Sequence, residues 1–131
     1  MILADTSALY ALLDRDDRNH VAAVAAWDTV SAETPLTHNY VVVETMALTQ
    51  HRLGMGATED LCRLVLPALR IEFIDPATHD AAMAALLAAG QRDVSLVDRV
   101  SFEVMRRLGI RRAFAFDADF ADEGLELVPP T

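Results

Sequence analysis

Short apolar runs alternate along the chain with longer segments in which apolar residues recur every three or four positions. The short runs predict buried strands at residues 2–4, 35–37, 71–74, 113–116 and 125–128. The longer segments predict helices over about 6–13, 19–31, 39–53, from 58 to an interruption near 67, 75–90 and 95–109. Strands that alternate with helices pair mainly in parallel, and helices cover both faces of their sheet. The pattern therefore predicts an α/β fold of three layers around a mainly parallel sheet of four to five strands, in a single domain that spans residues 1–131.

Residues that favour helix ends support these limits. Asn39 is the expected N-cap of the helix that stops at Gly54. Asp75 and Pro76 supply an N-cap and a first-turn proline to the alanine-rich helix that ends at Gly90.

Four carboxylates interrupt or end the apolar stretches. They are Asp5 after residues 2–4, Glu44 between residues 40–43 and 46–48, Asp98 after residues 96–97, and Asp117 after residues 113–116. A buried carboxylate costs several kcal/mol unless it is paired, hydrogen-bonded or bound to a metal. In a parallel sheet the functional crevice lies beyond the carboxyl ends of the strands, where Asp5 and Asp117 emerge. We therefore expect the four acids to converge on one rim and to share a hard divalent ion, which prefers oxygen ligands.

Each acid has a simpler explanation as well. Asp5 can cap the first helix, Asp98 stands where a capping-box acid would follow Ser95, and Asp117 can cap a turn. Glu44 is different, because it lies too deep in its helix to cap anything and its neighbours are apolar. Glu44 is thus the strongest single indication of a functional site.

The net charge of −9 argues against a general nucleic-acid-binding surface, which is normally basic. A polyanion would have to be held locally, through metal and a few arginines. The candidates for such phosphate contacts are Arg99, Arg15 and Arg18, although a solvated surface role fits each of them equally well.

The composition also bounds compartment and membrane association. The single cysteine, Cys62, excludes an intrachain disulfide, fits a reducing cytoplasm and is expected to be a core thiol. No apolar run approaches the roughly 18–20 residues of a membrane span. The short apolar start ends at Asp5 and lacks a basic region, so no signal peptide is expected.

At these residues the chain resembles the PIN-domain ribonucleases, and among them the VapC-type toxins of bacterial toxin–antitoxin (VapBC) pairs. The resemblance covers nearly the whole length. It is carried by Met1-Ile2-Leu3-Ala4-Asp5-Thr6-Ser7-Ala8-Leu9, Val43-Glu44-Thr45, Ser95-Leu96-Val97-Asp98, Met105-Arg106-Arg107-Leu108-Gly109-Ile110 and Phe116-Asp117-Ala118-Asp119-Phe120.

The resemblance implies a PIN-like fold and a magnesium- or manganese-dependent endoribonuclease that acts as a toxin. The family's acidic quartet carries over to Asp5, Glu44, Asp98 and Asp117 as catalytic and metal-ligating residues, with Thr6 or Ser7 as its hydroxyl residue. The implied partners are an RNA substrate, a VapB-type antitoxin whose tail would occupy the acidic rim, and a second copy of the chain in a homodimer.

Two departures from the family pattern concern the end of the site. Ala115 stands where many relatives have a threonine. Asp119 adds a carboxylate that either binds metal or caps the turn, and capping is slightly favoured.

Two other functions remain open on the residues alone. A PIN-like binding module could retain its acids without turnover, although such a module need not keep this costly set. A metal-dependent phosphatase that acts on small substrates would use similar ligands.

Overall fold

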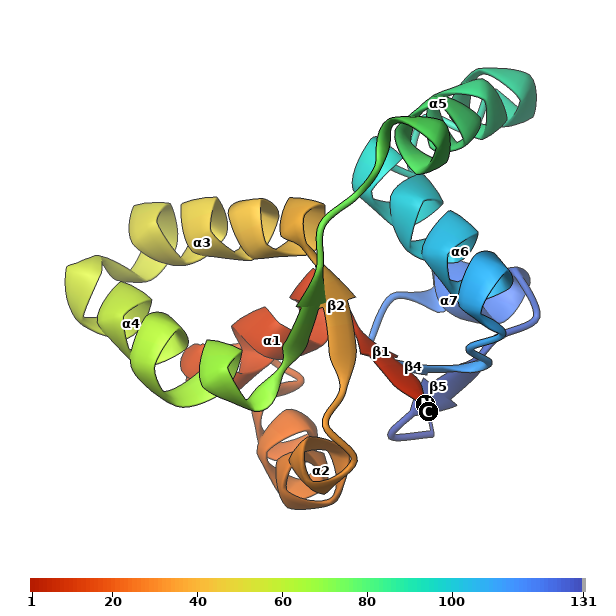
Figure 1. Cartoon of the computed structure of the whole chain (residues 1–131). Coiled ribbons are helices and arrows are strands. Elements are labelled where there is room, and N and C mark those ends of the chain that lie inside the picture. The colour runs from red at the N-terminus through yellow and green to blue at the C-terminus, as the bar shows by residue number, and fades with distance from the viewer. Residues whose placement is uncertain (131) are drawn as a thin grey trace.

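A computed structural model describes residues 1–130 (Figure 1). The strands are β1 (Ile2–Ala4), β2 (Leu36–His38), β3 (Arg70–Glu72), β4 (Arg112–Phe114) and β5 (Glu126–Val128). The helices are α1 (Thr6–Leu13), α2 (His20–Ala32), α3 (Asn39–Leu53), α4 (Met55–Asp60), the π-turn η1 (Leu61–Val65), the 3₁₀ turn η2 (Leu66–Ala68), α5 (Pro76–Ala89), α6 (Leu96–Leu108) and α7 (Ala118–Asp122). No helix within residues 1–130 is both long and apolar enough to cross a membrane.

All strand pairs are parallel, and the five strands are ordered β3-β2-β1-β4-β5. The chain starts in the central strand, builds outward to β2 and β3, and then returns to add β4 on the other side of β1. The point where the direction of winding changes therefore lies between β1 and β4. Ligands in open parallel sheets bind in the crevice at such a point.

The two faces of the sheet bury different sets of helices, because side chains alternate along a strand. Ile2, Ala4 and Phe114 pack with α1, α2, α3 and the segment from α4 to η1. Leu3 and Ala113 face the opposite way and pack with α5, α6 and α7. Figure 1 shows these layers on either side of the strands. The predicted three-layer α/β fold with a parallel sheet is confirmed.

The start of α3 differs from the sequence prediction. His38, not Asn39, is the N-cap, and its Nδ1 accepts a hydrogen bond from the Val41 backbone N–H at 3.4 Å. The Asn39 side chain instead accepts a bond from the Ile74 backbone N–H at 2.8 Å, which fastens the exit of β3 to α3. Asn39, the residue expected to cap α3, therefore makes a long-range contact that the sequence alone does not show.

The segment around Cys62 also differs. The predicted helix begins at Met55, earlier than expected, and changes to a π-turn at residues 61–65. Leu61 and Val65 take the inward positions of this turn, which leaves Cys62 exposed, with its Sγ 4.0 Å from Met46 Sδ. The expectation of a core thiol is therefore wrong.

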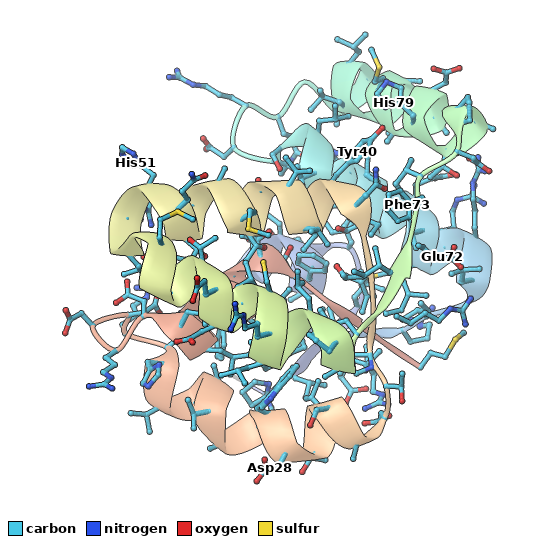
Figure 2. All side chains as sticks on the ribbon, turned by 60° about the vertical axis from the view of Figure 1, so that its left-hand side comes forward. Asp28, Tyr40, His51, Glu72, Phe73 and His79 are labelled. Carbon is cyan, nitrogen blue, oxygen red and sulfur yellow. The ribbon has the colours of Figure 1, made fainter. Side chains whose placement is uncertain are left out.

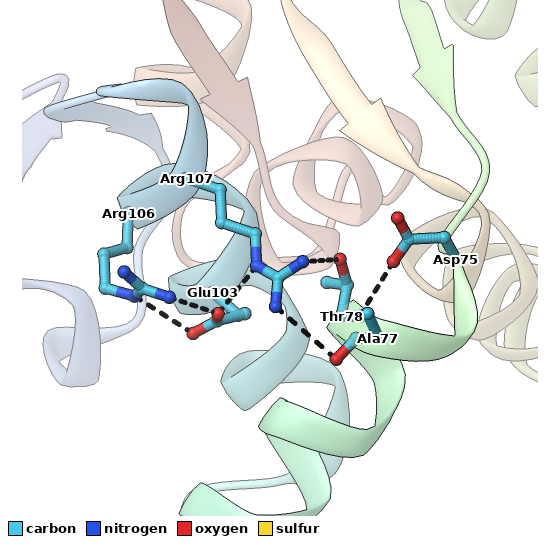
Figure 3. A network of polar contacts seen from close by, with 6 residues as sticks. All are labelled: Asp75, Ala77, Thr78, Glu103, Arg106 and Arg107. Carbon is cyan, nitrogen blue, oxygen red and sulfur yellow. Dashed lines mark hydrogen bonds and ion pairs between the residues drawn. The ribbon is translucent and has the colours of Figure 1, made fainter.

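Polar contacts hold α5 against α6 (Figure 3). Arg107 on α6 donates to Thr78 Oγ1 at 3.0 Å and pairs with Glu103 at 2.8 Å. Asp75 caps α5 by accepting the Thr78 backbone N–H at 2.8 Å. Next to Thr78, the first turn of α5 also contacts α3, where the Tyr40 hydroxyl lies 2.6 Å from His79 Nδ1 (Figure 2).

Candidate metal centre

The predicted site acids lie around the crevice between β1 and β4. Asp5 directly follows β1, and Asp117 is the third residue after β4 and the N-cap of α7. β4 ends at Phe114, two residues before the predicted end of this strand, and the short helix α7 forms where only a turn was predicted. Asp5 is also tied to the neighbouring strand, since its backbone N–H donates to the Phe114 carbonyl at 3.0 Å.

Asp5 is almost fully buried, with 3% of its surface exposed. Its Oδ2 accepts hydrogen bonds from the Ser7 hydroxyl at 2.6 Å and from the Ser7 backbone N–H at 3.1 Å. Burial raises the pKa of Asp5 to about 7, the two Ser7 bonds oppose that rise, and the charges of Asp98 and Asp117 add to it. Asp5 is therefore both a helix cap and a member of an acidic cluster.

Asp98 also combines the two roles that the sequence left as alternatives. Its Oδ2 accepts the Ser95 backbone N–H at 3.2 Å while its own N–H donates to Ser95 Oγ at 3.1 Å, which makes a capping box at the start of α6. Burial raises the pKa of Asp98 to about 6; the bonds from Ser95 oppose this, and the charges of Asp117 and Glu44 reinforce it. Capping fixes the carboxylate without removing it from the site.

Asp119 joins Asp98 and Asp117 in a tight group. One carboxylate oxygen from each residue lies within 4.8 Å of the others, the spacing of ligands around a shared ion. The Asp119 backbone N–H donates to Asp117 Oδ1 at 3.0 Å, so its main chain takes part in the cap while its side chain faces the cluster. Burial and the charge of Asp117 raise the pKa of Asp119.

Glu44 lies on the same rim but outside this group of three. It is half-buried on α3, and its charge contributes to the raised pKa of Asp98. The next residue, Thr45, is fully buried, and its hydroxyl donates to Thr6 Oγ1 at 3.1 Å. This bond joins α3 to the start of α1 and so holds Glu44 beside the crevice.

Hydroxyl residues position the acids, and their hydrogen-bond partners could not be assigned from the sequence. Ser7 accepts the Phe116 backbone N–H at 3.0 Å while it donates to Asp5, so one hydroxyl connects the segments that carry Asp5 and Asp117. The sequence offered Thr6 or Ser7 without distinguishing them. In the structure the Ser7 hydroxyl donates to Asp5, whereas the Thr6 hydroxyl accepts a hydrogen bond from Thr45.

The three predicted phosphate contacts occupy different surroundings. Arg99 is buried, and its guanidinium donates to Glu123 at 3.2 Å and to Gln91 at 2.7 Å. Arg15 and Arg18 are exposed on the turn between α1 and α2. Their roles toward RNA stay predictions.

The chemistry of the cluster fits a hard divalent ion. Within residues 1–130, none of the site acids has an arginine or histidine at ion-pair distance. Clustered carboxylates repel one another, and cations between them relieve that repulsion. An all-oxygen, anionic donor set is the kind that Mg²⁺ and Mn²⁺ prefer.

Comparison with known proteins agrees with the fold. The PIN domain family model matches residues 2–124. The chain is 34% identical over 131 residues to VapC20 of Mycobacterium tuberculosis, a 23S rRNA-specific endonuclease, with 99% of each chain covered. The crystal structure of that protein, a sarcin-ricin loop cleaving toxin, superposes with a TM-score of 0.82 over 95% of this chain and 96% of that chain.

A more distant structure shares the fold. FitAcB from Neisseria gonorrhoeae has a TM-score of 0.71 at 18% identity, with 97% of this chain and 96% of that chain covered. The full-length match to the family model and to VapC20 confirms the resemblance found in the sequence: this chain belongs to the PIN-domain family and is a homologue of the VapC-type toxin endoribonucleases.

Proposed function

We propose that the chain hydrolyses RNA phosphodiester bonds at the rim formed by Asp5, Glu44, Asp98 and Asp117, using Mg²⁺ or Mn²⁺. The observation that carries the proposal is the group of carboxylate oxygens from Asp98, Asp117 and Asp119, which lie within 4.8 Å of one another beside Asp5 and Glu44. Within residues 1–130, no arginine or histidine lies at ion-pair distance from these five acids, so their mutual repulsion favours the binding of a cation.

The residues divide into direct ligands and supporting acids. Asp5 and Asp98 are the principal ligands in this proposal, because both are fixed by serine hydrogen bonds and their charged forms are destabilised until a cation arrives. Glu44 and Asp117 complete the shell or hold water. We add Asp119 as a ligand, since its carboxylate lies in the group of three.

The divalent ion, when bound, supplies the positive charge that activates an attacking water and stabilises the leaving oxygen of the phosphodiester. The protein has two tasks: it holds the acids at fixed positions, and it offsets part of the cost that burial places on their charged forms. Ser7 and Ser95 contribute directly to the second task, because each donates a hydrogen bond to the charged carboxylate.

The substrate class and partners follow from the relatives and from charge. The full-length likeness to a 23S rRNA-specific endonuclease supports ribosomal RNA as the substrate class of this chain. The net charge of −9 and the acidic rim favour an antitoxin with an arginine-bearing tail that enters the site. We also propose a homodimer, a single PIN domain and a cytoplasmic location for the toxin.

The test is cleavage of ribosomal RNA by the purified chain, with and without a chelator. Wild type should cleave only with Mg²⁺ or Mn²⁺, and Asp5→Asn and Glu44→Gln should each lose activity at least about 100-fold. Asp80→Asn, which removes an exposed carboxylate on α5, is the matched control and should remain active. Undiminished metal-dependent activity in both site variants would refute the assignment, and hydrolysis of a phosphomonoester in place of RNA would indicate a phosphatase.

A further inference from the structure

A pocket borders the acidic rim on the side of α1 and α3. Its volume is about 320 Å³, and it is formed by the start of α1, the turn between α1 and α2, the second half of α3, and Phe116. Ser7 and Phe116 belong to its wall. Ser7 is the hydrogen-bond partner of Asp5 and Phe116 directly precedes Asp117, so the pocket is contiguous with the metal centre.

Two arginines give this pocket a positive charge. Neither Arg18 nor Arg52 has a carboxylate at ion-pair distance within the described part of the chain. The Arg52 guanidinium carbon lies 5.5 Å from the centre of the Tyr10 ring, which supports the side chain. The Tyr10 hydroxyl donates to Asp14 at 2.7 Å, and Arg52 contributes to the lowered pKa of Asp14 without forming an ion pair with it. Asp17 is the one carboxylate in the described wall, and its Oδ1 already accepts the Asn19 backbone N–H at 2.8 Å.

The pocket also has an apolar side. Phe116 is half-buried and Leu48 lies beside it in the wall. The Phe116 backbone N–H donates to Ser7 Oγ at 3.0 Å, which positions the residue beside the start of α1. An aromatic ring next to unpaired arginines is the combination that binds unpaired nucleotides, by base stacking and by phosphate contact.

A shallow groove of about 360 Å³ connects this pocket to Glu44. Glu44, Leu48 and Arg52 succeed one another four residues apart on one face of α3, and all three line the groove. Arg52 lies about 12 Å along the helix from Glu44. This separation places Arg52 beyond a phosphate held at the acids and suits it to a neighbouring nucleotide.

We propose that this pocket binds the nucleotide that flanks the cleaved bond of an RNA strand, with Arg18 and Arg52 on its phosphate and Phe116 against its base. The inference rests on the proposed ribonuclease function and adds to it a substrate subsite. Arg52, which sequence analysis did not select, becomes a phosphate-binding residue, and Arg18 is favoured over Arg15 and Arg99.

The test compares Arg18→Ala, Arg52→Ala and Phe116→Leu with Arg63→Ala, an exposed arginine outside the pocket that removes the same charge. With a saturating amount of Mn²⁺, each pocket variant should raise the KM for RNA cleavage about tenfold and leave kcat within about threefold. Binding of a labelled single-stranded RNA to the inactive Asp5→Asn protein should weaken by the same factor. Each arginine removed should lower the salt dependence of that binding by about one phosphate contact.

The two proposals fail in different ways. If wild type cleaves RNA and the pocket variants behave like Arg63→Ala, the nucleotide subsite is wrong and the ribonuclease function stands. If wild type does not cleave RNA in any divalent ion, both are wrong. Loss of kcat at unchanged KM would also overturn the subsite, because it would make these side chains part of the reacting centre.

Discussion

At the scale of single residues, the centre is built from carboxylates that each do two things. Asp5, Asp98 and Asp117 cap helices and also face one another across the crevice. The capping bonds hold each carboxylate in place, while burial makes its charge costly. Because the carboxylates are held in place while their charged forms are destabilised, binding of a cation is strongly favoured.

The raised pKa values predict how stability depends on pH in the metal-free protein. The pKa of Asp5 is about 7 and that of Asp98 about 6 in the folded chain, both above the usual 3.8. Their contribution to stability is complete below pH 3.8 and is lost as pH rises through 6 and 7. The free energy of unfolding should therefore fall by about 2–4 kcal/mol between pH 4 and pH 8, measured by urea titration in chelator.

Asp5→Asn should remove most of this fall, because the amide carries no titrating charge. Adding Mn²⁺ at pH 8 should restore the stability of wild type and leave Asp5→Asn nearly unchanged. A wild-type profile that is flat over this range would contradict the proposed burial of charge at Asp5.

Ser7 provides a second test at this scale. Ser7→Ala keeps the backbone bond to Asp5 but removes the hydroxyl that donates at 2.6 Å. Cleavage should drop about 10–100-fold, as is usual when a hydrogen bond that orients a metal ligand is lost. The pH at which activity appears should also rise, because the bond lowers the pKa of Asp5. Ser7→Thr retains a hydroxyl and should recover part of the rate; equal rates for the alanine and threonine variants would contradict the role.

At the scale of elements, much of the fold follows from the sequence because the apolar pattern is local information. The alternation of strand and helix, the proline start of α5 and the glycine ends of α3, α5 and α6 all appear in the chain itself. The differences have causes that the apolar pattern does not show. Asn39 is taken by the exit of β3, and Cys62 is turned outward by a π-turn that no short pattern marks.

The site divides along the same line. The acids of the quartet interrupt or end apolar stretches, so they can be recognised in the sequence. The pairing of Thr45 with Thr6 and of Ser7 with Phe116 joins residues far apart in the chain, and only the folded structure shows it.

Two helix caps give a matched experiment at this scale. Ser95→Ala removes the hydroxyl that accepts the Asp98 backbone N–H, so it loosens the first turn of α6, which carries Asp98, although the Ser95 backbone N–H can still donate to the carboxylate. Asp75→Ala removes the cap of α5, which lies outside the acidic site. Each change should cost about 1 kcal/mol of stability in urea unfolding. RNA cleavage should fall at least about tenfold in Ser95→Ala alone. Equal activities in the two variants would show that the cap does not position Asp98.

At the scale of the whole molecule, the order of the strands gathers the acids. Asp5 comes from the central strand, Glu44 from α3, Asp98 from α6 and Asp117 from the segment after β4. Residues that are distant in the chain meet because β4 returns to the side of β1.

The outer surface carries a different feature, a set of exposed apolar side chains on and near α5. These apolar side chains support the proposed homodimer. Phe73, between β3 and α5, is 77% exposed, and Leu87 on α5 is 79% exposed (Figure 2 shows Phe73). Light scattering should give twice the chain mass for wild type, and Phe73→Glu with Leu87→Glu should give the monomer mass. Val21→Glu on α2, which is 80% exposed, is the control and should leave the mass unchanged. A wild-type monomer would contradict the proposal.

The return of β4 to the centre of the sheet also determines when a newly made chain can form its complete acidic site. Synthesis proceeds from the N-terminus, so Asp5, Glu44 and Asp98 are made before Asp117 and Asp119. Until those last two acids arrive and β4 docks beside β1, the nascent polypeptide lacks a complete cation cage. During most of translation the chain therefore cannot hold the ion that the proposed cleavage of RNA requires.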